Sequence, residues 1–166
     1  MKMNIFFLHW DPRICAQMHV DKHVVKMILE TCQMLCAVHH LLASSYEPPY
    51  KLTHKNHPCT VWAMESLANY KWLATLGMEL CEEYTYRYGK VHKCEQYIRK
   101  MIKNFPKFLN TEFTPPAQAM PEIYKSKDAV ESYRQYYFFE KHLLLYWKKR
   151  EEPEWVTEIR EMFTTK

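Results

Sequence analysis

Glycine is almost absent from this chain, which has only 2 glycines among 166 residues. Tight hairpin turns, glycine-rich phosphate loops and dinucleotide-binding fingerprints all require more glycine than that. Because 48% of the residues are hydrophobic, the chain can still bury a core. We therefore expect a mainly α fold, and the length suits one domain over residues 1–166.

The chain also lacks an apolar run long enough to cross a membrane, and an apolar leader that ends in small residues. Its six cysteines lie within apolar segments and show no CxxC spacing. We expect an intracellular protein, in the cytoplasm or nucleus of a host cell, with reduced thiols and no membrane partner. The slight excess of Lys and Arg, 23 against 19 Asp and Glu, weakly favours anionic partners.

Turn residues and hydrophobic spacing predict helices separated by a few long, ordered loops. The apolar residues 3–8 predict a short strand or a buried extended arm. Asp11 and Pro12 are typical of a helix start, and one long helix is predicted from there to about Leu42. The other predicted elements are a helix from near Pro58 to a left-handed cap at Gly89, a helix over about 90–103, an ordered loop over 105–121, a helix after Ser126 or Asp128, and a short final helix from Pro153.

The first predicted helix has an apolar face and, roughly opposite to it, a polar stripe. The apolar face consists of Val24, Ile28, Thr31, Leu35, Val38 and Leu42, and the stripe of His19, His23, Lys26, Glu30 and Gln33. A carboxylate such as Glu30, two turns after His23, can do general acid–base work if it lies in a cleft. There, burial would raise its pKa and Lys26 would lower it. The alternative is a solvent-exposed Lys–Glu pair.

The loop of residues 51–58 is a candidate phosphate-binding segment. It places His54 and His57 just before a predicted helix N-terminus, where backbone N–H groups and the helix dipole favour an anion. The alternative is a capping loop with ordinary surface histidines.

A basic and aromatic run, residues 84–93, surrounds the predicted end of the second helix. It interleaves Arg87, Lys90, His92 and Lys93 with tyrosines. Cations that neutralise phosphates, next to rings that stack on bases, suit nucleic acid and extruded bases in particular. The alternative is a helix end whose basic residues interact with the helix dipole.

His19 and His23 have the i, i+4 spacing that lets two histidines on one helix face hold the same metal ion. The glutamate of the HExxH pattern is missing between them, and Cys32 and Cys36 lie on another face. We predict no metal, and keep a metal-dependent hydrolase that uses these and the loop histidines as an alternative.

Several segments resemble the phage-type pyrimidine-dimer DNA glycosylases, the endonuclease V kind. The segment 21–30, DKHVVKMILE, is similar to the helix in which these enzymes carry a glutamate seven residues after a histidine; here these are His23 and Glu30. The segments 69–73 (NYKWL), 82–89 (EEYTYRYG) and 152–155 (EPEW) also look similar. The resemblance covers the chain in outline.

This resemblance implies an enzyme that cleaves the glycosidic bond of a damaged pyrimidine and then cuts the strand by lyase chemistry, without a cofactor. In that family the nucleophile is the α-amine of the N-terminal residue, which forms a Schiff base with the sugar. Carried over, Glu30 would stabilise the sugar cation and move protons, His23 would sit near the DNA backbone, and Met1 would supply the amine. Since Lys2 is too large for normal removal of Met1, the other possibilities are a start at Met3 or the absence of the lyase step.

The expected partner is double-stranded DNA with a damaged or modified base, bound by a monomer. The predicted phosphate or substrate contacts are Lys22, Lys26, His54, His57, Arg87, Lys90, His92 and Lys93. A non-catalytic nucleic-acid-binding protein remains a second alternative.

Overall fold

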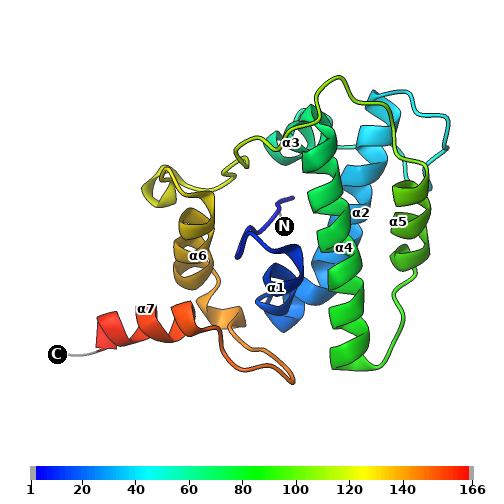
Figure 1. Ribbon diagram of the computed structural model, residues 1–166. Helices are drawn as coiled ribbons and strands as arrows, with labels where there is room; N and C mark the ends of the chain where they lie inside the picture. Colours follow the sequence, from blue (N-terminus) through cyan, green and yellow to red (C-terminus); the bar gives the residue numbers. More distant parts are fainter. Residues whose placement is uncertain (1–2, 165–166) are drawn as a thin grey trace.

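Seven α-helices and two 3-10 turns, with no strand, make up the computed structural model over the residues it describes, 3–164. In chain order they are α1 (Pro12–Gln17), α2 (Asp21–Leu41), α3 (Pro58–Glu65), α4 (Leu67–Tyr88), α5 (Cys94–Lys103), η1 (Glu122–Tyr124), α6 (Ala129–Glu140), η2 (His142–Leu144) and α7 (Glu154–Thr164) (Figure 1). The prediction of a mainly helical fold is confirmed. No helix in the described part of the chain is long and apolar enough to span a membrane.

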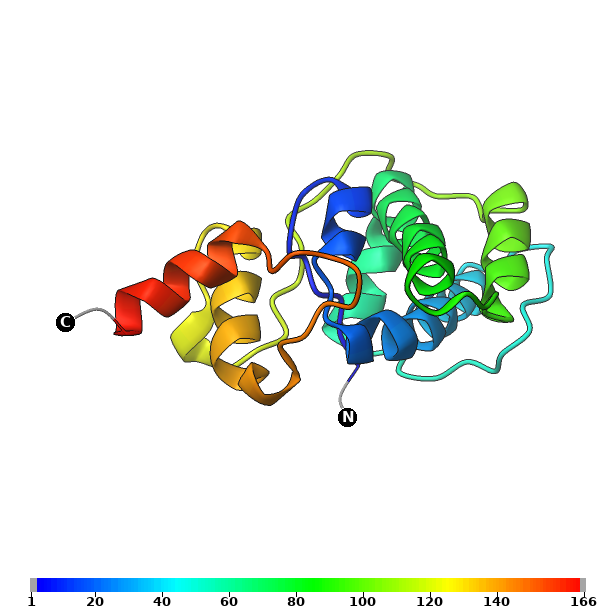
Figure 2. The same ribbon diagram turned by 90° about the horizontal axis from the view of Figure 1, so that it is seen from below.

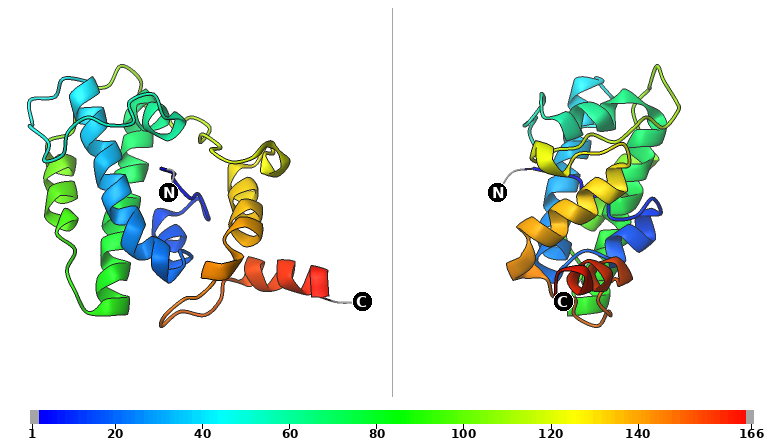
Figure 3. Two further views of the ribbon diagram at one scale, coloured as in Figure 1. Left: turned by 180° about the vertical axis from the view of Figure 1, so that it is seen from behind. Right: turned by 90° about the vertical axis from the view of Figure 1, so that its left-hand side faces the viewer.

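The long helices α2 and α4 lie side by side at the centre of the molecule (Figures 1 and 2). Helix α5 covers one side of this pair, and α6 and α7 lie on the other, beyond the N-terminal segment (Figure 3). The helices pack closely where α2, α4 and α5 meet. A Cβ on Gly77 would lie 3.0 Å from side-chain carbons of both Thr31 and Ile98, so this position has room for glycine alone without a shift of its neighbours.

The N-terminal segment of residues 3–8 is a buried extended arm, one of the two predicted forms. It runs between α6 and the α1–α2 region. The ring of Phe6 contacts Tyr133 and Tyr137 of α6 on one side and His23 of α2 on the other. The arm therefore joins the C-terminal helices to the core, and one apolar core extends from Met3 to Ile159.

The prediction of one continuous helix from Pro12 to Leu42 is wrong, because the chain breaks between α1 and α2. Carbonyl groups that a continuous helix would use internally are bound from elsewhere: Arg87 donates to the carbonyls of Gln17 and His19, and the Trp147 indole donates to that of Met18. These contacts satisfy the backbone at the break, and α2 starts afresh at Asp21.

The second predicted helix is also two helices, α3 and α4, separated by Ser66. The backbone of Ser66 is extended, and its hydroxyl accepts from the N–H of Asn69 to cap α4. The next two N–H groups donate to carbonyls of residues 110 and 111 in the long loop. The loop thus supplies the hydrogen bonds that the break would otherwise lose.

The other predicted helix ends agree with the structure to within a few residues. Gly89 takes the left-handed conformation, with φ of 68°, and caps α4 as predicted. The next helix begins at Cys94, not at residue 90: Lys93 is its N-cap residue, and the ring of His92 just before it accepts from the Cys94 N–H. Asp128 caps α6 as predicted, and α7 follows Pro153.

Candidate active site

Glu30 lies at the middle of α2 and is 8% exposed. Its Oε1 atom is buried and has no hydrogen-bond partner within the described part of the chain. Burial raises the pKa of this carboxyl, while the charge of Lys26, the backbone N–H of Asn4 and the charge of Lys141 act in the opposite direction. Lys26 is exposed, but Glu30 is buried and no ion pair joins the two among the described residues, so the alternative of a solvated Lys–Glu pair does not describe this helix.

His23, two helical turns before Glu30, is also buried. Its ring stacks on Phe6, and its Nδ1 atom lies 2.7 Å from the hydroxyl of Tyr137. Burial, together with the charges of His19, Lys141 and Lys26, lowers the pKa of His23 to about 3. The imidazole is therefore neutral at physiological pH and carries no charge to offer a phosphate.

Two cavities flank this part of α2. The arm cavity, of about 730 Å³, is bounded by the N-terminal arm, the start of α3, the end of the long loop and the end of α6. Its lining residues are Met3, Asn4, Phe6, His57, Pro58, Ala119, Met120, Pro121, Tyr136, Glu140 and Lys141. The helix cavity, of about 720 Å³, is lined by Asp21, Lys22, His23, Val25, Lys26, Tyr88, Leu143, Leu144 and Tyr146. Glu30 lines neither cavity, but the backbone of Asn4, which lines the arm cavity, acts on its carboxyl and lowers its pKa, so the carboxyl lies behind this part of the arm.

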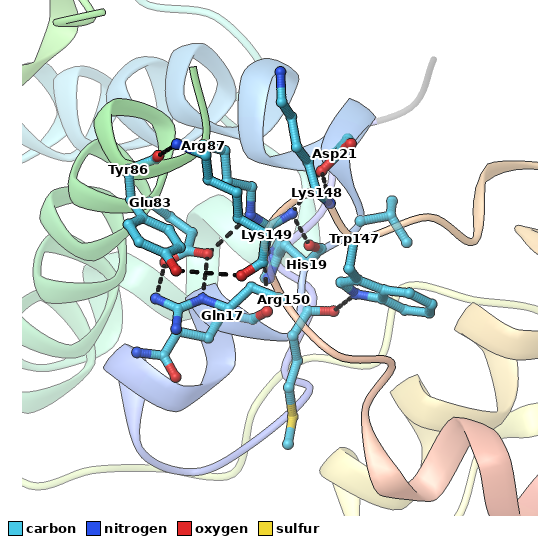
Figure 4. Close-up of polar contacts among 12 residues, drawn as sticks. Gln17, His19, Asp21, Glu83, Tyr86, Arg87, Trp147, Lys148, Lys149 and Arg150 are labelled. Atoms are coloured by element: carbon cyan, nitrogen blue, oxygen red, sulfur yellow. Dashed lines mark hydrogen bonds and ion pairs between the residues drawn. The ribbon is translucent and has the colours of Figure 1, made fainter. Parts of the chain in front are cut away.

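Arg87 was predicted to contact DNA, but the structure gives it a different role. Its guanidinium is fully buried and donates to the carboxylates of Asp21 and Glu83, at 2.9 and 2.8 Å, besides the two carbonyls at the helix break (Figure 4). Arg150 adds two hydrogen bonds to Glu83, both 2.9 Å long. With four acceptors around it and no access to solvent, Arg87 is withdrawn from the DNA contacts and holds α2, α4 and the segment before α7 together.

Four of the other predicted contacts lie near the cavities. Lys22 and Lys26 are exposed and line the helix cavity. His57 lines the arm cavity, is half-buried, and accepts the Cys59 N–H as the cap of α3. Burial and the neighbouring His54 lower the pKa of His57. His54 itself is exposed, three residues before that cap.

The last three predicted contacts, Lys90, His92 and Lys93, lie between α4 and α5. This segment is on the side of the α2–α4 pair that faces away from the arm and α6 (Figures 1 and 2). None of the three lines either cavity. Lys90 and Lys93 are exposed, whereas the ring of His92 accepts a hydrogen bond from the Cys94 N–H at the start of α5. The structure therefore does not bring this group to Glu30.

Sequence reasoning missed the part of the site that comes from the second half of the chain. Tyr136 and Lys141 line the arm cavity, and Tyr137 holds the ring of His23. The dense aromatic run of residues 133–139 was the available signal. This run falls within the helix predicted after Ser126 or Asp128, to which the sequence assigns no part of the site.

The alternative of a histidine-bound metal has no ligand set within residues 3–164, where no group of three or more His, Cys, Asp or Glu side chains could hold a metal ion. His19 donates through Nδ1 to the carbonyl of Cys15, and burial lowers its pKa to about 4. Met1, predicted as the amine, lies outside the described residues.

A family model described as pyrimidine dimer DNA glycosylase matches residues 3–103. The matched segment contains the arm and helices α1 to α5, with His23 and Glu30, and ends before Tyr136 and Lys141. No curated protein and no solved structure gave a match.

Proposed function

The chain belongs to the family of pyrimidine dimer DNA glycosylases, and from that premise we propose that it excises damaged or modified pyrimidines from double-stranded DNA, with Glu30 as its acid–base group. The observation that carries this assignment is a buried carboxyl with one unpaired oxygen beside a cavity large enough for a base. Unpaired buried polar atoms are costly, and they occur where a ligand completes their bonding.

Glu30 acts at the sugar. Breaking the bond between C1′ and the base leaves positive charge on C1′ and the ring oxygen, and a carboxylate held nearby in a dry site stabilises that charge strongly. Burial raises the pKa of Glu30, which favours the same carboxyl as a proton carrier in the reaction.

Lys22, Lys26, His54 and His57 contact phosphates around the two cavities. Neutral His23 lies beneath this surface, where its ring stacks on Phe6 and holds Phe6 in place. A duplex that extends past the end of α4 would also contact Lys90, His92 and Lys93.

We also propose that the protein cleaves the strand at the resulting abasic site. It requires a primary amine that forms a Schiff base with C1′, and the family resemblance points to the α-amine of Met1. Neither glycosylase nor lyase chemistry of this kind uses a cofactor.

The test compares Glu30→Gln with Glu79→Gln on a UV-irradiated duplex and on duplexes with modified pyrimidines. Burial also raises the pKa of Glu79, but this residue lies on α4, where the charges of Arg13 and Asp11 act on it and those of Lys26 and Lys141 do not, so it is a matched control. We expect Glu30→Gln to lose at least about 100-fold in base release, and the control to retain it. Absence of base release by the wild-type protein, with binding intact, would favour the non-catalytic alternative, and stoichiometric metal in the purified protein would favour the hydrolase.

A further inference from the structure

Three buried thiols meet where α2 packs against the start of α5. Cys32 and Cys36 lie one turn apart on α2, and Cys94 is the first residue of α5. The thiol of Cys32 is hydrogen-bonded to the thiols of both Cys36 and Cys94. These cysteines line neither the arm cavity nor the helix cavity, so the proposed function does not account for them.

Two further side chains complete this thiol cluster. The hydroxyl of Tyr50 lies 3.7 Å from Sγ of Cys94, and Sγ of Cys36 lies 3.9 Å from Sδ of Met101 on α5. Tyr50 is half-buried in the loop between α2 and α3, and Lys93, next to Cys94, is exposed. Cys94 is therefore buried but close to the surface, where a local opening of the loop is enough to admit a molecule as small as a peroxide.

The surroundings of Cys94 favour its thiolate, which is the reactive form of a cysteine. The thiol of Cys32 and the hydroxyl of Tyr50 donate hydrogen bonds to its sulfur, and the charge of Lys93 acts on it. Together they lower the pKa of Cys94 below its ordinary value, against the effect of burial. Cys32 keeps its proton, since its hydrogen bonds with Cys36 and Cys94 raise its pKa. A nucleophilic sulfur thus lies beside a protonated one.

Helix geometry selects which two of the three thiols can bond. A disulfide needs its two Cβ atoms about 3.5–4.5 Å apart, whereas residues one turn apart on a helix hold them about 5–6 Å apart. Cys32 and Cys36 therefore cannot pair without distortion of α2. Cys94 comes from a second helix, so no fixed spacing of this kind separates it from Cys32.

We propose that Cys32 and Cys94 are a redox pair, and that a hydroperoxide converts them to a disulfide that joins α2 to α5. The pair takes no part in the proposed function. The bond closes residues 32–94 into a loop that includes α3, α4 and the segment with His54 and His57. A cross-link over such a long segment restricts the unfolded chain and so stabilises the fold.

The reaction balances with one peroxide. The Cys94 thiolate attacks one peroxide oxygen, the O–O bond breaks, and the second oxygen leaves with the electron pair and takes up the proton that the Cys94 thiol released. Cys94 is then a sulfenic acid. The sulfur of Cys32 attacks the sulfur of Cys94, the S–S bond forms, and the S–O bond breaks. The leaving hydroxide takes the Cys32 proton and departs as water, so the two thiols are oxidised and the peroxide is reduced.

The experiment treats the folded wild-type protein with hydrogen peroxide, blocks the remaining thiols with iodoacetamide, and maps the non-reduced peptides by mass spectrometry. Cys32→Ser and Cys94→Ser each remove one partner. Cys36→Ser is the matched control, because Cys36 is equally buried in the same cluster but lies on the same helix as Cys32. Thermal melting of the reduced proteins checks that all four are folded, and the peptide map of the wild type does not depend on any variant.

We expect a Cys32–Cys94 disulfide in the wild type, with loss of two of its six free thiols and their recovery in dithiothreitol. The bond should persist in Cys36→Ser, be absent from the other two variants, and raise the melting temperature of the wild type by at least about 5 °C.

Six free thiols after oxidation, a disulfide between any other pair, or a sulfinic acid at Cys94 without a disulfide overturns this inference. A melting temperature no higher than that of the reduced protein does the same. Base release is not part of this measurement, so each of these results leaves the proposed function in place.

Discussion

Phe6 stacks on His23 with ring centroids 4.6 Å apart and an angle of 8° between the planes. Phe6 lines the arm cavity and His23 lines the helix cavity, so the stacked pair is the wall common to both. The N-terminal arm thereby sets the shape of the two cavities, and the backbone of Asn4 in the same arm lowers the pKa of the Glu30 carboxyl.

We expect Phe6→Leu to open this wall. The substitution keeps most of the buried volume but loses the flat contact with His23 and the edge contact with Tyr137. The free energy of unfolding should fall by about 1–2 kcal/mol, and base release should fall more than the loss of folded protein explains. Urea unfolding and the base-release assay measure the two effects. Phe163→Leu, at an exposed position on α7, is the control and should change neither.

Buried neutral histidines should make the protein sensitive to acid. Burial lowers the pKa of His19 and His39 to about 4 and that of His23 to about 3, from 6.5 in an unfolded chain. Between pH 6.5 and about 4 the unfolded state binds more protons, so stability falls as the pH falls through this window. Each histidine contributes a slope of up to about 1.4 kcal/mol per pH unit.

Urea unfolding at about pH 7, 6 and 5 measures this slope. His39→Gln should flatten it by about one proton while lowering stability at pH 7, because the ring of His39 bonds to Ser44 and Tyr70. An unchanged slope in this variant would show that His39 is protonated in the folded state.

The buried ion network, in which Arg87 pairs with Asp21 and Glu83, should dominate the electrostatic contribution to stability. Arg87→Met leaves Asp21 without its arginine and removes the donor to two carbonyls at the break between α1 and α2. We expect a loss of about 3–5 kcal/mol, as for the removal of one partner of a buried ion pair. Arg99→Met, which breaks an exposed pair with Glu95, should cost about 0–1 kcal/mol. Equal losses in urea unfolding would contradict the structural role given to Arg87.

Features that depend on neighbours in sequence were predicted correctly, and features that depend on residues far apart in the chain were not. The caps at Gly89 and Asp128 depend on neighbours in sequence, and both are confirmed. The break after α1 depends on Arg87, which binds a carbonyl 68 residues away, and on Trp147, which binds one 129 residues away. Helical spacing carries no sign of such partners, so the break could not be predicted.

The same limit applied to the candidate site. The seven-residue spacing of His23 and Glu30 was visible in the sequence, and it drew attention to the right stripe of α2. Burial of that stripe was not visible, because the arm and α6 cover it from far away in the chain. A polar stripe on one helix looks the same whether water or another segment covers it, and this is why the burial of His23 and Glu30 was not predicted.

The side of the molecule on which DNA lies can be determined from the salt dependence of binding. Each lysine–phosphate contact contributes about 0.9 to the slope of log K against log salt concentration, because it releases counterions from the duplex. Lys26 lines the helix cavity, whereas Lys93 lies between α4 and α5 and lines neither cavity. We therefore expect Lys26→Ala to reduce the slope by about one and Lys93→Ala to leave it unchanged, measured by fluorescence anisotropy on a damaged duplex over a range of salt concentrations. If instead Lys93→Ala alone reduced the slope, the duplex would lie across the α4–α5 side, away from both cavities, and Glu30 would be too far from the DNA to act on a base.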